Sequence, residues 1–378
     1  MNIPVTKPVM GEEEVAAVAE CLSSGWLVQG PKVAEFEGRW SDYVGAGYSR
    51  ATTSCTTALH LAMLAIGVTA GDEVIVPAFT WVATANAVEY CGATPVFVDI
   101  DPATFNIDVM AIEKAITPRT VAVVPVHEFG LSADMEPLLE IARLHGLKVV
   151  EDAACACGAR YNGRHVGTFG DVGCFSFHPR KAITTGEGGM VTTGDADIAH
   201  LIEVLRSHGA EASDLQRHTS GRGFALPEFA KLGYNYRMTD IQAAIGIVQM
   251  DRLEGILDAR RAVAHRFSSE LAHLSGITLP VEPDGSRHVY QSYVTMVDGS
   301  GDDRDRIALA LQDEGIATRQ GTHAVHALKY YRDKYGTSPQ DFPNAWRADR
   351  QSLTLPVYAG MTRQEQDYVI EKVRSQFS

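Results

Sequence analysis

Long apolar runs and an excess of basic residues are both absent from this sequence of 378 residues. A membrane-spanning helix needs about 20 consecutive apolar residues, and no such run occurs. The first seven residues also lack the charged and apolar regions of a secretion signal. The formal net charge is −14, whereas nucleic acids and anionic lipids bind basic surfaces. The sequence therefore predicts a cytoplasmic protein with no nucleic-acid or membrane partner.

Cysteine is scarce and irregularly spaced. All six cysteines lie in the first half of the chain, at Cys21, Cys55, Cys91, Cys155, Cys157 and Cys174. This spacing is not that of a disulfide framework in a chain of this length. Cys155 and Cys157 form one Cys-x-Cys pair, but no second pair completes a zinc site with four ligands. We therefore expect reduced thiols and no metal.

The hydrophobic content is sufficient for a large core. Hydrophobic residues make up 45% of the chain, which predicts a globular protein with one large and one smaller domain. Short apolar strands alternate with helices in the first half. The predicted strands cover residues 73–77, 94–99, 120–127, 147–151 and 172–177, with helices at 58–66, 80–90, 108–116 and 133–145 between them. Such alternation predicts the α/β class, a mostly parallel sheet covered by helices.

The alternation stops in the last third of the chain. Residues beyond 252 offer one clear strand at 290–297 and helices near 303–314 and 363–374. We therefore predict a large domain over residues 1–252 and a small α+β domain over residues 253–378, against which the N-terminal segment can pack.

An N-terminal helix and a long polar stretch can also be identified from the sequence. Residues 11–24 are predicted to form an amphipathic helix, because Val15, Val18 and Leu22 share a face. Residues 207–233 form a polar stretch that is too long for an ordinary connection. We expect a functional loop there.

Lys181 lies between the predicted strand at residues 172–177 and a turn rich in threonine and glycine at residues 184–189. An amine at the end of a strand can form a Schiff base with an aldehyde or ketone, and enzymes that use pyridoxal phosphate (PLP) depend on this chemistry. A lysine after a strand is more often a solvated loop charge. Lys181 by itself leaves both interpretations open.

Three other features lie at predicted strand exits. Ser54-Cys55-Thr56-Thr57 opens a helix, where free N–H groups and hydroxyls can bind a phosphate or simply cap the helix. Asp152 follows a buried strand and can pair with a pyridine nitrogen or cap a turn. Trp81 can stack on a cofactor ring or belong to the core. Their order along one parallel sheet, together with Lys181, favours a PLP site over four unrelated features.

Other nucleotide and hydrolase motifs are missing. The sequence has no Gly-Lys-Ser/Thr ending of a P-loop, no G-x-G-x-x-G after the early strands and no G-x-S-x-G. Nucleotide hydrolysis and hydride transfer are therefore disfavoured.

Several segments together resemble one known family. They are residues 54–59, 77–87, 125–127, 151–154, 176–189 and 234–237. These segments are similar to those of the DegT/StrS family of sugar aminotransferases, which are fold type I PLP-dependent transferases. The resemblance covers nearly the whole chain, and the segment around Lys181 is specific to the family.

The resemblance implies roles for the residues near the cofactor ring. Lys181 is implied to be the catalytic lysine that forms the Schiff base with PLP, and Asp152 to pair with the pyridine nitrogen. Trp81 is implied to lie against the ring. Cys155 stands near the PLP phenolic oxygen, where the family often has Gln or His, and a thiol is a poorer hydrogen-bond partner.

The resemblance also implies how the PLP phosphate is held. Cys55, Thr56 and Ser176 are implied to bind it within one subunit. Asn235 is implied to reach the phosphate of the neighbouring subunit, and this implies a homodimer with shared active sites.

Two regions are expected to bind the substrate. The family's His-Tyr-x-Pro-x-His segment is replaced by residues 321–326, in which His326 matches by position and His323 can substitute for the lost first histidine. Residues 206–237 carry five basic and three acidic residues in a chain of net charge −14. We therefore expect Arg222 and Arg237 to bind the diphosphate of a nucleotide, with a solvated loop as the alternative.

The activity implied by the resemblance is PLP-dependent transamination by a ping-pong mechanism. L-Glutamate donates the amino group, and the acceptor is a keto sugar attached to a nucleotide, with a 4-keto-6-deoxyhexose as the expected sugar. Sugar dehydratases of the family carry His in place of the lysine, so Lys181 argues against that activity. A cyclitol or other keto substrate stays open, as does a PLP-binding regulatory protein without turnover.

Overall fold

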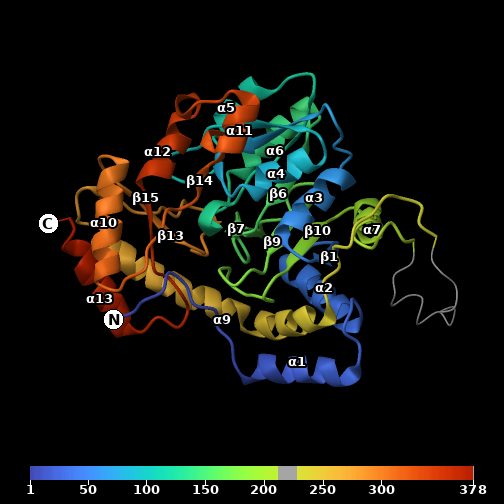
Figure 1. The fold of residues 1–378 in the computed structure, drawn as a ribbon, viewed down its shortest axis with the longest axis horizontal. Helices are drawn as coiled ribbons and strands as arrows, with labels where there is room; N and C mark the ends of the chain where they lie inside the picture. Colours follow the sequence, from blue (N-terminus) through green and yellow to red (C-terminus); the bar gives the residue numbers. More distant parts are fainter. Residues whose placement is uncertain (212–227, 378) are drawn as a thin grey trace.

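The computed structural model describes residues 1–211 and 228–377 (Figure 1). Its longer helices are α1 (Glu12–Ser24), α2 (Pro31–Val44), α3 (Cys55–Ala65), α4 (Ala83–Tyr90), α5 (Val109–Ala115), α6 (Met135–His145), α7 (Ala196–Leu205), α9 (Asp240–Leu271), α10 (Gly301–Asp313), α11 (Lys329–Tyr335), α12 (Pro343–Gln351) and α13 (Arg363–Arg374). Short 3₁₀ turns occur at Glu128–Gly130, Val325–Ala327 and Pro339–Asp341.

A seven-stranded sheet forms the centre of the molecule. Its spatial order is β1 (Tyr48–Thr52), β10 (Gly189–Thr193), β9 (Val172–Ser176), β6 (Lys148–Asp152), β5 (Thr120–Val123), β2 (Glu73–Pro77) and β4 (Thr94–Val98). Neighbouring strands from β9 to β4 pair in parallel, and β10 alone runs antiparallel to both of its neighbours. The predicted α/β class with a mostly parallel sheet is therefore confirmed.

Helices cover both faces of this sheet (Figure 1). Side chains alternate between the faces along each strand: Val74 and Val76 of β2 pack in the cluster that contains α3 and α4. Ile75 packs with α5 and α6 on the opposite face. The parallel strands are buried on both faces, which explains their continuous apolar sequences.

The C-terminal part builds a second sheet. It is antiparallel and consists of β11 (Ile277–Thr278), β13 (Tyr293–Val297) and β15 (Ser352–Leu355). Helices α10 and α13 pack on this sheet, and both chain termini lie near them in Figure 1. The long helix α9 contributes Ala243 to the core of the large sheet and Phe267 to that of the small sheet. The predicted boundary between residues 252 and 253 falls inside this helix and stays a prediction.

Short strands fill the junctions. They are β3 (Phe79–Thr80), which pairs with β14 (His323–Ala324), and the set β7 (Arg160–Tyr161), β8 (Arg164–His165) and β12 (Ser286–Arg287). The β3–β14 pair joins the end of β2 to a segment of the C-terminal part.

Several predicted boundaries differ from the structure, including the following three. The predicted strand at residues 120–127 ends at Val123, because the chain bends toward Phe129, which has a φ of 55°. The predicted helix at residues 80–90 begins at Ala83, because Thr80 belongs to β3. The predicted strand at 290–297 begins three residues late, since Tyr290 has a φ of 47°, which no extended strand allows.

The apolar face predicted for the first helix does not face the core. Val15 is 68% exposed and Leu22 is 54% exposed, whereas Glu14 and Cys21 are buried. Glu14 accepts a hydrogen bond from Gln249 and pairs with Arg252 on α9. Helix α1 therefore docks through polar contacts and presents apolar side chains outward.

Within residues 1–211 and 228–377, no helix is long and apolar enough to cross a membrane. The same residues contain no group of three or more His, Cys, Asp or Glu side chains placed to hold a metal ion.

Candidate active site

Lys181 stands in the turn that follows β9, at the carboxyl end of the parallel strands. Its backbone N–H donates to the His178 carbonyl (2.8 Å), which closes the turn. Its side chain is half-buried, and Nζ donates to Cys155 Sγ at 3.1 Å. The structure therefore brings together two residues that the sequence assigned to the same cofactor.

Asp152 is the last residue of β6, the strand next to β9. The carboxylate is 4% exposed and accepts hydrogen bonds from Thr84 Oγ1 (2.8 Å) and from the Ala154 N–H (3.2 Å). Burial raises the pKa of Asp152, while the hydrogen bond from Thr84 and the charge of Lys181 act in the opposite direction. These contacts fix the carboxylate beside the lysine.

Glu151, the neighbour of Asp152, points to the other side of the strand. Its carboxylate accepts the N–H groups of Gly167, Phe169 and Gly170 and contacts His127 Nε2 at 3.0 Å. Three of these contacts stabilise the loop after β8, and the fourth joins Glu151 to the segment after β5. Of the two adjacent acids, Asp152 alone faces the candidate site.

The first turn of α3 forms an anion-binding cup. Ser54 Oγ accepts the Thr57 N–H, so the N–H groups of Cys55 and Thr56 have no partner within the helix. Ser176 pairs with Gly189 across β9 and β10. A Cβ at Gly189 would lie 2.5 Å from the Ser54 backbone, so a glycine is required for this close approach. The sheet thus brings Ser176 toward the helix start.

The electrostatics of the lysine follow from its neighbours. Burial acts to lower the pKa of Lys181, but Cys155, Cys55 and Asp152 outweigh it and the pKa ends above its usual value. Burial raises the pKa of the Cys155 thiol, although Lys181 opposes this. The ammonium form of Lys181 and the thiolate form of Cys155 therefore stabilise each other, whereas burial disfavours both charged forms.

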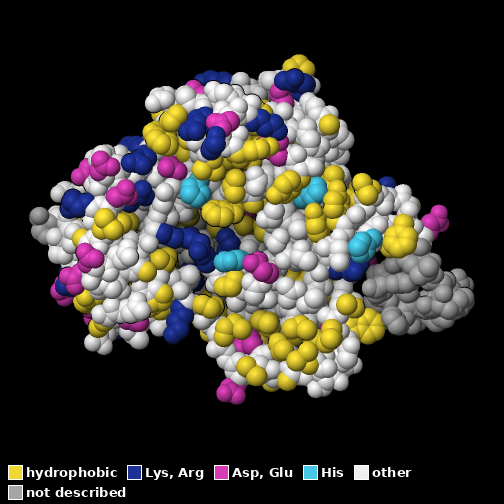
Figure 2. Space-filling model, viewed as in Figure 1, with side chains coloured by type: hydrophobic (Ala, Val, Ile, Leu, Met, Phe, Trp, Pro, Cys, Tyr) yellow, Lys and Arg dark blue, Asp and Glu magenta, His cyan; other side chains and the backbone are white. Residues whose placement is uncertain are grey.

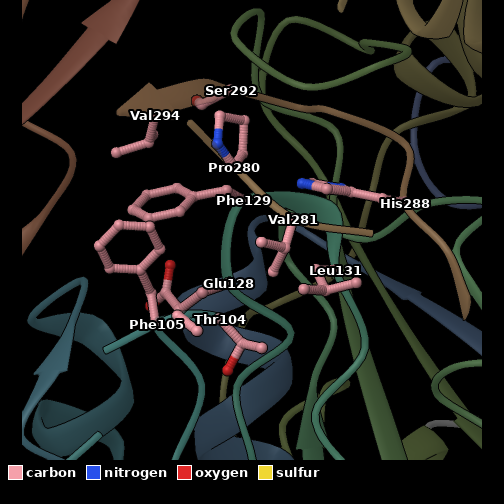
Figure 3. Close-up of a pocket in the computed structure, with 11 residues that line it drawn as sticks. Thr104, Phe105, Glu128, Phe129, Leu131, Pro280, Val281, His288, Ser292 and Val294 are labelled. Atoms are coloured by element: carbon pink, nitrogen blue, oxygen red, sulfur yellow. The ribbon is translucent and has the colours of Figure 1, made fainter. Parts of the chain in front are cut away.

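Glu128 is a component of the site that the sequence did not reveal. Its side chain is 4% exposed, and burial raises its pKa to about 8. Figure 3 shows it beside the rings of Phe105 and Phe129 in a cavity of about 10 Å³. A cavity of that size holds one water molecule at most, so the carboxyl group gains little hydration.

A chain of hydroxyl groups connects Glu128 to Asp152. Glu128 hydrogen-bonds Thr80, and Thr80 Oγ1 lies 3.0 Å from Thr84 Oγ1. Thr84 Oγ1 in turn donates to Asp152. Both threonines are fully buried. Two acids that are 24 residues apart in the sequence are therefore linked through the first residues after β2.

Trp81 and His323 lie together at the outer side of the site. Trp81 is 59% exposed, and its ring centroid is 5.8 Å from that of His323. The pairing of β3 with β14 produces this contact, because His323 is opposite Thr80. A flat aromatic with an open face is free to stack on a ligand.

His326 occupies a different environment. Its side chain is fully buried, with its ring centroid 4.8 Å from that of Phe342 and 6.4 Å from that of Phe97. A ring enclosed in this way packs the core and offers no surface to a ligand. The predicted contact of His326 with a substrate is therefore without support.

The segment before α9 lies along the end of β1. Asn235 is exposed and pairs with Ser207, while Arg237 pairs with Thr52. This places both residues near the start of α3, on the outer surface. Arg222 lies outside the described residues, and its predicted contact with a diphosphate stays a prediction.

These residues fit PLP. Its phosphate requires free N–H groups, which the first turn of α3 offers, and its ring nitrogen requires a buried carboxylate, which Asp152 offers. Lys181 extends from the neighbouring strand to the same edge of the sheet. The individual roles of these residues stay predictions.

Comparison with known proteins identifies close relatives. The profile of the "DegT/DnrJ/EryC1/StrS aminotransferase family" matches residues 8–374. The chain is 43% identical over 375 residues to the spore coat polysaccharide biosynthesis protein SpsC of Bacillus subtilis, covering 98% of this chain and 96% of that protein. It is 42% identical over 372 residues to GDP-perosamine synthase of Caulobacter vibrioides, with the same coverage.

A solved structure agrees with the fold. The protein Spr1654 from Streptococcus pneumoniae, in its PLP-form, superposes with a TM-score of 0.93 and 30% sequence identity, covering 100% of this chain and 98% of that one. The similarity therefore extends over both sheets and all the elements that carry the candidate site.

Proposed function

Because the chain belongs to the DegT/DnrJ/EryC1/StrS aminotransferase family, whose members are PLP-dependent sugar aminotransferases, we propose that it aminates a keto sugar attached to a nucleotide, with L-glutamate as amino donor. The expected acceptor is a 4-keto-6-deoxyhexose. The similarity to GDP-perosamine synthase supports a nucleotide-linked substrate.

One observation carries the proposal. Lys181 and Asp152 follow adjacent parallel strands, and both lie within reach of the anion cup at the start of α3. An amine, a carboxylate and a phosphate site are the three groups that hold PLP. When bound, PLP supplies an electron sink that lets a proton leave the carbon next to an amino group.

Lys181 is proposed to hold the cofactor and then to move the proton. Its ammonium has to lose a proton before it can act as a nucleophile or a base, and Cys155, at 3.1 Å, is the group it contacts. Burial raises the pKa of the Cys155 thiol, which disfavours its charged thiolate form. Its proposed role is to accept a hydrogen bond and orient the amine.

Glu128 is proposed to complete the support of Asp152. Three contacts link Glu128, Thr80, Thr84 and Asp152, but the two hydroxyl groups supply only two protons. A third proton has to reside on one of the acids, and the raised pKa of Glu128 places it there at neutral pH. Each hydroxyl then donates toward Asp152, which stabilises its ionised form.

The substrate side is proposed to use exposed groups. Trp81 and His323 line the approach to the cofactor ring, and Arg237 lies at the edge of the sheet near the start of α3. Together with Arg222, Arg237 is proposed to bind the diphosphate of the nucleotide. This assignment is supported by the basic character of residues 206–237 in an acidic chain.

We also propose a homodimer, located in the cytoplasm. Figure 2 shows hydrophobic side chains gathered on the part of the surface formed by α1, where Val15 and Leu22 are exposed. An apolar helix face of this kind supports subunit contact. Asn235 is exposed, and it is proposed to reach the phosphate of the neighbouring subunit. Sedimentation of the purified holoenzyme measures the subunit number.

The proposed activity is tested by product formation. Purified enzyme with PLP and L-glutamate is incubated with a set of keto-sugar nucleotides, and 2-oxoglutarate and the amino sugar are quantified. Equal amounts of the two products with at least one substrate are expected. PLP binding without 2-oxoglutarate in any reaction would favour a regulatory protein without turnover.

A further inference from the structure

Two arginines line a cavity next to Lys181. Arg180 directly precedes Lys181, and Arg319 lies near Cys155, the residue that the lysine contacts. Both line a cavity of about 140 Å³ between the turn after β9 and the small sheet. Figure 2 shows Lys and Arg side chains gathered near the centre of this face, with His and acidic side chains beside them.

Arg180 and Arg319 lack the ionic partners that some other arginines in the described part of the chain have. Arg206, for example, pairs with Glu37 at 2.5 Å, and Arg252 pairs with Glu14. Among the residues that the structure describes, neither Arg180 nor Arg319 forms an ion pair. The chain has 47 acidic and 33 basic residues, so a scarcity of acids does not explain this arrangement.

The arrangement is electrostatically unfavourable without an anion. Arg319 Nε is buried and has no hydrogen-bond partner in the described part of the chain. Burial lowers the pKa of Arg319, and the charge of Arg180 lowers it further. His178 is also affected by both arginines and by Lys181. Arg180, Arg319 and Lys181 thus all act on His178, and the carboxylate of Glu187 opposes them.

The cavity has the size and lining of a small carboxylate site. Pockets that bury a whole drug-sized ligand measure about 300 Å³ or more, so this cavity is too small for a nucleoside diphosphate. Its lining also contains Val5, Leu355 and Val357, which suit the methylene groups of an amino acid side chain. A guanidinium group binds a carboxylate through two parallel hydrogen bonds.

We propose that Arg180 and Arg319 form the carboxylate-binding subsite for the amino donor, an acidic amino acid. This inference rests on the proposed function, because it assigns the donor of the same reaction a place beside Lys181. The subsite would hold a carboxylate of the donor while its amino group faces the cofactor. The acceptor sugar and its diphosphate occupy other surfaces, so a change here alters one half of the reaction selectively.

The test compares Arg319→Gln with Arg347→Gln in the holoenzyme. Arg347 is exposed on α12 and contacts Gln351, so its substitution removes the same charge far from the cavity. Glutarate, which has two carboxylates but no amino group, is the binding probe and is titrated by calorimetry. Loss of a charged hydrogen-bonded contact is expected to weaken glutarate binding about 10- to 100-fold in Arg319→Gln. Arg347→Gln is expected to bind it as the unmodified enzyme does.

The donor half of the reaction gives the second measurement. The concentration of L-glutamate that half-saturates bleaching of the PLP absorbance is expected to rise by a similar factor in Arg319→Gln, with the sugar half-reaction unchanged. Arg180→Gln, on the exposed side of the cavity, provides a second variant if Arg319→Gln does not fold.

Two results would overturn the subsite. One is glutarate affinity in both cavity variants equal to that of Arg347→Gln. The other is unchanged glutarate binding together with loss of nucleoside diphosphate binding, which would assign the arginines to the acceptor. If the unmodified enzyme binds glutarate through Arg319 but glutamate never bleaches its absorbance, the subsite stands and the proposed transamination fails.

Discussion

The candidate site has a buried part, here called the floor, and an exposed part, here called the rim, and the two differ in burial and in hydrogen bonding. The floor consists of Lys181, Asp152, Glu128, Thr80 and Thr84, which lie at the ends of strands or in the turns and helix that follow them. Apart from the half-buried lysine, these residues are at most 4% exposed. The rim consists of exposed or half-exposed side chains contributed by segments that are far apart in the sequence.

Trp81 and His323 represent this rim, and Arg180 and Arg319 extend it around the cavity. Their side chains have few hydrogen-bond partners, whereas every acid of the floor has one. An unsatisfied group costs more when buried than when exposed. Substitutions on the floor should therefore lower the rate of the chemical step, and substitutions on the rim should mainly change the affinity for ligands.

The largest difference between the two regions is expected from Lys181→Ala. Removal of the amine should abolish covalent attachment of PLP and lower the turnover rate by at least about 10⁴-fold, since a nucleophile and a base are lost together. Turnover and the absorbance of bound PLP are the two measurements. Lys148→Ala removes an exposed lysine that pairs with Asp171 and is the matched control. Turnover of Lys181→Ala at the normal rate would end the assignment.

A smaller effect is expected from Thr84→Val. It removes the hydroxyl group that donates to Asp152, and loss of a buried hydrogen bond to a charged group should lower kcat by about 10- to 100-fold. Thr69→Val removes a similar hydroxyl contact, with Asp72, at the surface and should leave kcat unchanged. Equal rates in the two variants would show that the hydroxyl chain does not support the reaction.

Glu128→Gln is expected to change the pH dependence of stability. The pKa of Glu128 is raised from 4.5 to about 8, so the folded state binds an extra proton between these values. The stabilisation is fully present below pH 4.5 and is lost as the pH rises to about 8, about 5 kcal/mol in total. In Glu128→Gln this loss should disappear from the free energy of unfolding.

The control for that measurement is Glu136→Gln, on the exposed part of α6. Urea unfolding at several pH values between 4.5 and 8 gives the comparison. Parallel curves for the unmodified protein and Glu128→Gln would contradict a proton on Glu128. Glu128→Gln keeps an N–H donor for Thr80, so its kcat at neutral pH should stay close to that of the unmodified enzyme. Glu128→Leu has no such donor, so its kcat should fall about as much as that of Thr84→Val.

The smallest effect is expected on the rim. Trp81→Leu should weaken PLP binding about 2- to 10-fold, because a stacking contact contributes roughly 0.5–1.5 kcal/mol. A double-mutant cycle with His323→Ala measures whether the contact at 5.8 Å couples the two side chains. A 100-fold loss of kcat in Trp81→Leu would show that Trp81 supports the chemical step, and this would contradict the proposed difference between floor and rim.

The sequence was sufficient to predict the floor's two main residues. Apolar strands that alternate with helices indicate a parallel sheet, and the carboxyl ends of parallel strands share one edge. Lys181 and Asp152 could therefore be placed together before the structure was considered. The α/β class and the family followed from the same segments and are confirmed.

Glu128 could not be found in this way. Its segment, residues 120–128, resembles one continuous strand with a terminal acid, and an acid after a strand is ordinarily solvated. The bend after Val123 turns Glu128 inward, and its partner Thr80 comes from β3. Only the tertiary fold brings these residues together.

The C-terminal part was also poorly predicted. Strand β15 and helices α11 and α12 were missed, because the last third of the sequence has no regular alternation. Helix α1 was predicted, but the sequence did not reveal which way its apolar face points. Periodicity shows that Val15 and Leu22 share a face, but it does not distinguish a face that packs on the core from one that stays exposed in the chain.

The central claim is that this chain carries an amino group from an amino acid to a sugar through Lys181. The most direct measurement is the visible absorbance of the purified holoenzyme during sequential addition of L-glutamate and a keto-sugar nucleotide. Glutamate should bleach the PLP band with release of one 2-oxoglutarate per active site, and the keto sugar should restore it. An absorbance that neither compound changes, in a protein that retains bound PLP, would contradict the account.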